Sequence, residues 1–125
     1  MMNFLFIDSQ VAAFHKVMGI PDRDTPGVPD EQTLRLRMRL VSRAKLAPNL
    51  PEIADALGDI DYVVAGTRLQ LGIKGVAVAD AIHEANMNKA PGGVVIRDEF
   101  GKVRKPANWT PPDIASVLRA QGWEP

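Results

Sequence analysis

The sequence predicts an all-α protein built as a single domain. Apolar residues recur at intervals of three and four over several separate stretches, and clusters of proline and glycine divide those stretches. A chain of 125 residues has the size of one domain. We therefore expect a helical bundle of four to five helices over about residues 8–89. A C-terminal arm, either extended or folded as a short β-hairpin, should follow over about residues 90–125.

The first two helices have recognisable ends. Apolar spacing predicts a helix that starts at residue 8 or 9 and ends at Met18, where Gly19 stops it. Three prolines within residues 21–29 exclude regular structure there. Asp30 follows as the expected N-cap of a second helix, which should run to about Lys45.

The third helix should be the central element of the core. It is expected over residues 51–71, with proline in its first turn and a broad apolar face along its length. A fourth helix is expected over residues 75–88. The apolar residues 94–96 and a turn at Gly101 suggest the hairpin, and a last short helix should occupy residues 113–120.

Composition narrows the functional class. Fifteen basic and fifteen acidic residues give a net charge of zero, which argues against binding to nucleic acid or to a membrane surface. The absence of cysteine excludes disulfides and thiolate metal sites. No apolar run approaches the roughly 20 residues needed to cross a bilayer. We expect a soluble cytoplasmic protein, and helices with such broad apolar faces favour a homodimer.

Three carboxylates form a stripe on the third helix. Glu52, Asp55 and Asp59 stand at i, i+3 and i+7, so at roughly 100° per residue they lie within about 60° of one another. The residues between them include no base that could relieve their repulsion. A hard divalent cation, Mg²⁺ or in its place Mn²⁺, would do so. The alternative is that the stripe pairs with arginines of a neighbouring helix, of which the chain supplies several. A buried salt bridge of Arg37 to Asp55 or Asp59 is one such pair.

Basic residues gather elsewhere in the chain. The second helix carries several arginines with one opposing glutamate, and the tail is rich in lysine. A metal-binding acidic stripe beside a lysine-rich arm suits a polyphosphate ligand, because metal and ammonium groups share its negative charge. The alternative reading is that both runs are solvated surfaces.

Several motifs occur in an order that resembles a known family. They are residues 51–72 (PEIADALGDIDYVVAGTRLQLG), 83–89 (HEANMNK), 101–106 (GKVRKP) and 111–113 (PPD). The ordered set resembles the MazG-like all-α nucleoside triphosphate pyrophosphohydrolases, the superfamily that includes dimeric dUTPases and phosphoribosyl-ATP pyrophosphohydrolase. The resemblance extends over about residues 11–113.

The resemblance implies hydrolysis between the α and β phosphates of an NTP or dNTP, giving the monophosphate and pyrophosphate. In that chemistry two acidic helices hold Mg²⁺ ions that orient an attacking water, and no covalent nucleophile is needed. Asp55 and Asp59 match the metal ligands of one helix, and Glu52 is a further candidate. No catalytic residue is assigned beyond these ligands. The residues that match substrate-binding positions are Asn86, Lys89, Lys102 and Lys105.

The chain departs from the family at the other acidic helix. The family carries a Glu-Glu-x-x-Glu motif after a Leu-Arg-x-x-Leu run, whereas here Arg43, Ala44 and Ala47 follow the run. The chain is therefore a natural relative that has lost the motif, an internally deleted version, or a sequence from which a segment is absent. The abrupt return of the match at Pro51 favours an absent segment.

Two functions remain open at this stage. One is a Mg²⁺-dependent nucleotide pyrophosphohydrolase whose base specificity the sequence does not select. The other is a catalytically impaired relative that acts as a nucleotide-binding or helical interaction module. His15 and His83 are expected to be structural, and Trp109 is expected to pack on the core rather than stack on a base.

Overall fold

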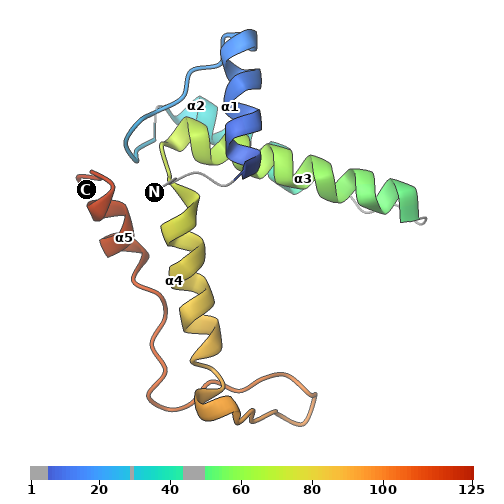
Figure 1. Cartoon of the computed structure of the whole chain (residues 1–125), viewed down its shortest axis with the longest axis vertical. Helices are drawn as coiled ribbons and strands as arrows, with labels where there is room; N and C mark the ends of the chain where they lie inside the picture. Colours follow the sequence, from blue (N-terminus) through green and yellow to red (C-terminus); the bar gives the residue numbers. More distant parts are fainter. Residues whose placement is uncertain (1–5, 29, 44–49) are drawn as a thin grey trace.

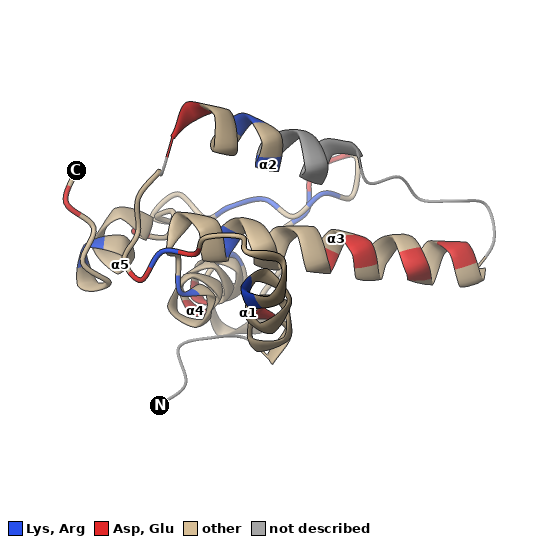
Figure 2. Cartoon of the chain, turned by 90° about the horizontal axis from the view of Figure 1, so that it is seen from above, with Lys and Arg blue, Asp and Glu red and all other residues tan. Residues whose placement is uncertain are grey.

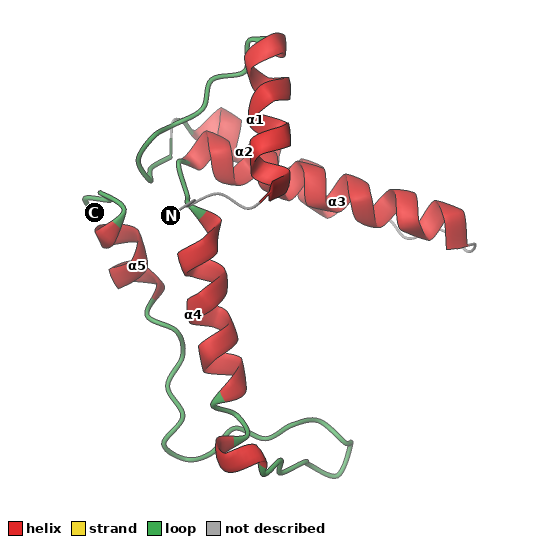
Figure 3. Cartoon of the chain, viewed as in Figure 1, coloured by secondary structure: helices red, strands yellow, loops and turns green. Residues whose placement is uncertain are grey.

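The computed structural model describes residues 6–28, 30–43 and 50–125. This part of the chain contains five α-helices and no β-strand, so the predicted all-α class is confirmed (Figures 1 and 3). The elements are α1 (Phe6–Met18), α2 (Glu31–Arg43), α3 (Leu50–Leu71), α4 (Gly75–Met87), the 3₁₀ turn η1 (Pro91–Gly93) and α5 (Ile114–Ala120).

Two of the expected helix starts are confirmed by their caps. Asp30 precedes α2, and its carboxylate accepts hydrogen bonds from the Thr33 amide at 2.6 Å and from the Thr33 hydroxyl at 2.7 Å. Asp113 precedes α5 and accepts in the same way from Ser116. Each aspartate satisfies an amide of the first turn that has no partner within the helix, which fixes where the helix begins.

The core lies where α1 and α2 pack on the C-terminal half of α3. Val11 of α1 meets Ala65 and Leu69 of α3, with Ile7 and Ala12 packed around them. Figure 1 shows α1 crossing α3 in this region. Burying a valine or leucine side chain completely contributes roughly 1.5–3 kcal/mol, so this small set holds α1 on α3.

The N-terminal half of α3 extends beyond this core (Figure 1). Leu57, expected to lie in the core, is 50% exposed, and Tyr62 is 39% exposed. The expectation of a central core helix therefore holds for the C-terminal half of α3, whereas part of the apolar face of the N-terminal half is exposed in the single chain. The physical reason is that the buried contacts of α1 fall on Ala65 and Leu69, near the C-terminal end of α3.

A left-handed glycine turns the chain from α3 into α4. Gly72 has φ +71°, and a Cβ atom there would lie 2.0 Å from the Thr25 carbonyl oxygen, so only glycine fits. α4 then leads away from the other three helices, and the chain returns beside it through α5 (Figure 1).

The C-terminal arm between η1 and α5 is a structured loop. One isolated antiparallel bridge joins Arg97 and Val103, and the Arg104 amide donates to the Ile96 carbonyl at 2.7 Å. Trp109 anchors the following segment, because its indole Nε1 donates to the Ala85 carbonyl at 2.7 Å. Within the described residues, no helix has the length and apolar character needed to cross a membrane.

Candidate functional site

The acidic stripe lies on the projecting half of α3. Glu52, Asp55 and Asp59 are all exposed, and Figure 2 shows acidic bands along this part of the helix. Helical spacing places the three carboxylates on one side, as the sequence predicts. Glu52 also stands in the first turn, where the helix dipole favours negative charge.

Asp55 and Asp59 have no cationic partner in the part of the chain that the structure describes. The ion pairs found there are His15–Asp22, Glu31–Arg35 and Asp8–Arg68. Exposed carboxylate oxygens on a single helical face are the hard ligands that Mg²⁺ prefers, so the donor set fits this ion. The described residues do not, however, bring three acidic or histidine side chains into one closed metal-binding group.

Arg37 is not the partner of the acidic stripe, which corrects the alternative drawn from the sequence. Its Nε donates to Oε1 of Gln70, near the C-terminal end of α3, and its Nη2 lies 3.5 Å from Nε2 of His15. The register of α2 against α3 therefore directs this guanidinium toward the core and away from the projecting half.

His15, Asp22, Arg37 and Gln70 form a polar cluster at the junction of the helices. Nδ1 of His15 lies 2.5 Å from Oδ1 of Asp22, and the ring is 2% exposed. Burial lowers the pKa of Arg37 from its ordinary value, and the negative charge of Asp22 acts in the opposite direction. The histidine is thus held between a carboxylate and a guanidinium.

A buried ion pair lies about two helical turns away from this cluster along α1. Asp8 is fully buried, and both of its carboxylate oxygens accept from Arg68, one of them from Nε at 3.1 Å. Sequence reasoning did not identify this pair, because the residues stand sixty positions apart and their spacing carries no signal. Both groups join α1 to α3 and serve the fold rather than a ligand.

The candidate substrate-binding residues are only partly brought together. Lys89 and Lys105 lie over the Trp109 ring, with Nζ 5.6 Å and 4.5 Å from its centroid. Such contacts attract a cation to the negative face of the ring and hold the two ammonium groups on a common platform. Asn86 is exposed on α4, and the Lys102 amide donates to Asp98 within the arm.

The acidic stripe and the lysines lie on separate parts of one chain. Figure 1 shows the projecting half of α3 and the far end of α4 leading in different directions from their junction. Ala44 and Ala47, which stand where the family places glutamates, lie outside the described residues. The described part therefore presents one acidic helix and one basic platform rather than an assembled catalytic centre.

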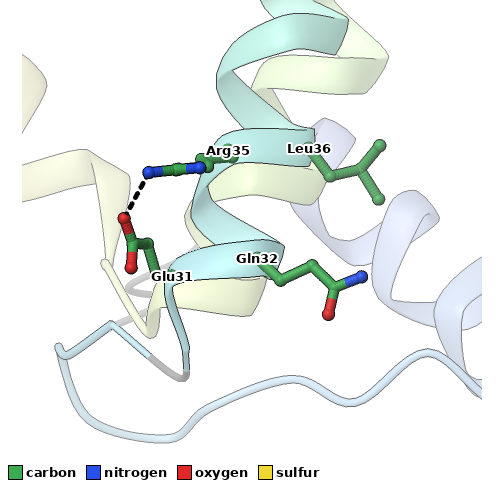
Figure 4. A pocket seen from close by; sticks show the side chains of 4 residues that line it. All are labelled: Glu31, Gln32, Arg35 and Leu36. Carbon is green, nitrogen blue, oxygen red and sulfur yellow. Dashed lines mark hydrogen bonds and ion pairs between the residues drawn. The ribbon is translucent and has the colours of Figure 1, made fainter.

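A pocket on α2 is unrelated to either group. It has a volume of about 450 Å³ and is lined by Glu31, Gln32, Arg35 and Leu36. In Figure 4 the exposed ion pair between Glu31 and Arg35, 2.6 Å long, lies on one side, while Gln32 and Leu36 point to the other. Such an exposed pair contributes little binding specificity.

Comparison with known proteins adds no assignment. Neither the models of protein families nor the curated proteins that we searched gave a match to this chain.

Proposed function

We propose that the protein is a Mg²⁺-dependent nucleoside triphosphate pyrophosphohydrolase that acts as a homodimer and converts a (d)NTP to the monophosphate and pyrophosphate. One observation carries the proposal: Asp55 and Asp59 face solvent from the same side of α3, with no ion pair in the described part of the chain. The ordered motifs of the sequence give the class of substrate.

The acidic stripe would hold the metal. Glu52, Asp55 and Asp59 offer carboxylate oxygens, and Mg²⁺ commonly binds proteins through one or two carboxylates while retaining waters and substrate phosphates. When bound, the ion supplies charge neutralisation and an oriented water. Since these lysines lie on a separate part of the chain (Figure 1), Lys89 and Lys105 of the second copy in the homodimer would share the remaining phosphate charge through their ammonium groups.

The reaction consumes one water molecule and needs no other reactant. The water oxygen bonds to the α-phosphorus, the bond from that phosphorus to the bridging oxygen breaks, and pyrophosphate leaves. The role of the protein in this reaction is therefore to bind phosphate and to position the water.

Pyrophosphate release from individual dNTPs, with Mg²⁺ and with EDTA, tests the proposal. We expect release only with the metal. Asp55→Asn and Asp59→Asn should each lower kcat/KM more than about 10-fold, the smaller effect expected when a metal-site group is lost. Asp61→Asn is the matched control, since this acid lies on the same helix but off the stripe, and it should leave the rate unchanged. Equal rates in all four proteins would refute the proposal.

A second function is favoured because residues 43–47 lack the Glu-Glu-x-x-Glu motif of the family that the sequence resembles. A relative without the second acidic helix could bind nucleotide without hydrolysing it. A Tm raised by Mg²⁺ together with a non-hydrolysable dNTP, without pyrophosphate release from the natural dNTPs, would select this function. No Tm change and no release would exclude both functions.

A further inference from the structure

An open groove runs between α4 and α5. Its larger part, about 660 Å³, lies toward the start of α4, and a smaller part of about 350 Å³ continues toward the end of that helix. Val117 of α5 lines both parts, which makes the groove continuous. The apolar residues of the larger part are Val76, Ala77, Val117 and Ala120.

The groove is held open by fixed contacts at both of its ends. At one end the side-chain amide of Gln121 accepts from the Lys74 amide at 2.9 Å and donates to the Lys74 carbonyl at 3.0 Å. At the other end Trp109 is bonded to Ala85. The two helices are thus joined through polar contacts at the ends, while apolar residues between them remain accessible.

The arm loop, defined as residues 94–105, presents apolar side chains that remain exposed in the single chain. Val94, Val95 and Ile96 are 64%, 46% and 56% exposed, and Phe100 is 87% exposed. Consecutive exposed β-branched residues beside an exposed phenylalanine are the composition of an interaction surface rather than of an ordinary loop.

The arm loop is already ordered before it meets a partner. Oδ1 of Asp98 accepts from the amides of Phe100 and Lys102, both at 2.9 Å, and Nη1 of Arg97 donates to the Gly101 carbonyl at 2.8 Å. Gly101 has φ +80°, which closes the turn. A preformed loop loses little conformational entropy on docking.

The two surfaces are complementary in charge as well as in polarity. The larger part of the groove is lined by Asp80 and Lys74, and the smaller part by the carboxylates Glu84 and Asp113. The arm loop has four basic residues against two acidic ones, namely Arg97, Lys102, Arg104 and Lys105 against Asp98 and Glu99. Apolar side chains on a basic loop therefore match an apolar groove with an acidic rim.

The larger part of the groove is out of reach of the chain's own arm loop. The arm loop follows the C-terminal end of α4, whereas the larger part begins at Lys74, before its N-terminal end. Thirteen helical residues separate these ends by about 20 Å. A twofold axis across the middle of α4 would set two copies of this helix antiparallel, so that each arm loop lies beside the other copy's groove.

We propose that the arm loop of one copy docks in the α4–α5 groove of a second copy, and that the exchange is reciprocal. The interface gives the homodimer of the proposed function a contact surface, and it is tested without hydrolysis because it uses none of the three carboxylates of the acidic stripe. It assigns the exposed apolar residues of the C-terminal third of the chain to a dimer contact.

Cross-linking between two single-cysteine proteins tests the contact directly, because the natural chain has no cysteine. Val95→Cys in the arm loop is mixed with Ala77→Cys in the groove and treated with a short bismaleimide. We expect a covalent dimer that contains one copy of each protein. In the control experiment Ala13→Cys, at an exposed position of α1, replaces Ala77→Cys, and no covalent dimer should form. The proposal would be overturned if Val95→Cys cross-linked equally to Ala77→Cys and to Ala13→Cys, or if it did not cross-link to Ala77→Cys at all.

The dimer equilibrium gives a second test. We expect sedimentation to show a dimer of twice the 13.6 kDa chain mass, and Phe100→Asp to raise its dissociation constant at least 10-fold without changing the helical circular dichroism.

The charge exchange Asp80→Lys should weaken the dimer, and adding Lys102→Glu should restore it. A monomer at all concentrations, or a dimer unaffected by these changes, would contradict the proposal. Binding of an unrelated apolar peptide in the groove of a monomer would assign the groove to another partner.

Discussion

Single side chains at the junction of α1, α2 and α3 determine how those helices pack. A Cβ atom on Gly66 would lie 2.9 Å from Nη1 of Arg37 and 3.2 Å from Nε2 of His15. The glycine thus makes room for a buried guanidinium and a buried imidazole, although glycine is a poor helix former. At Gly58, on the projecting half of the same helix, nothing lies within 4 Å of such an atom.

These two glycines should respond in opposite ways to the same substitution. Gly58→Ala should stabilise the protein by up to about 1 kcal/mol, because alanine favours the helix and meets no obstacle. Gly66→Ala should destabilise it, because the added methyl displaces Arg37 from its bond to Gln70. Urea unfolding of both variants measures the difference, and equal stabilisation would show that the polar cluster is not packed around Gly66.

The buried pair of Asp8 and Arg68 should contribute far more than an exposed pair. Asp8→Ala leaves a guanidinium without its charged partner and should cost about 3 kcal/mol. Glu31→Ala, which removes the exposed partner of Arg35, should cost less than about 1 kcal/mol. Chemical denaturation compares them, and similar losses in the two variants would contradict the assigned burial.

Side-chain positions within one helix could be predicted from the sequence, whereas contacts between two helices could not. Helical spacing alone predicted that Glu52, Asp55 and Asp59 share one side of α3, because that arrangement is local. The partner of Arg37 was predicted wrongly, since it depends on the register between two helices. No pattern within either helix encodes that register.

At the scale of the elements, the capping aspartates link helix formation to pH. The hydroxyl and amide of Ser116 lower the pKa of Asp113 below its usual value of 3.8, and the amide of Thr33 does the same for Asp30. A carboxyl whose pKa is lower in the folded state stabilises the fold above its unfolded pKa. That contribution is lost as the pH falls through the folded value.

Removing one cap should therefore have a pH-dependent effect. We expect Asp113→Ala to lower Tm at pH 7, because α5 loses the acceptor for its first turn. The Tm difference from the natural protein should shrink below about pH 4, where the natural cap becomes protonated. Asp61→Ala removes an exposed aspartate that does not cap a helix, and it serves as the control. A Tm difference that stays constant from pH 7 to pH 3 would contradict the role of the ionised cap.

The two halves of α3 should differ in local stability. Ala65 and Leu69 are buried under α1, whereas the projecting half has exposed side chains at Leu57 and Asp59. Amides of residues 53–60 should exchange with solvent faster than those of residues 65–70. Hydrogen exchange followed by mass spectrometry measures this, and equal protection along the helix in a monomeric sample would contradict it.

On the scale of the whole molecule, apolar periodicity gave the number and order of the helices. It could not give their arrangement, because α4 leaves the core at Gly72 and turns toward α5 instead of packing on α3. Exposed residues such as Val17 and Phe100 look like core positions in the sequence. These side chains lie on the surface of a single chain, which is the physical reason for proposing that a second copy covers part of them.

Paramagnetic Mn²⁺ shows whether the acidic stripe of α3 binds a divalent metal ion, because it broadens the amide resonances of residues near its site. We expect broadening centred on residues 52–59, lost in Asp55→Asn and Asp59→Asn but retained in Asp61→Asn. Broadening centred on another group of carboxylates, or none at millimolar Mn²⁺, would contradict this expectation.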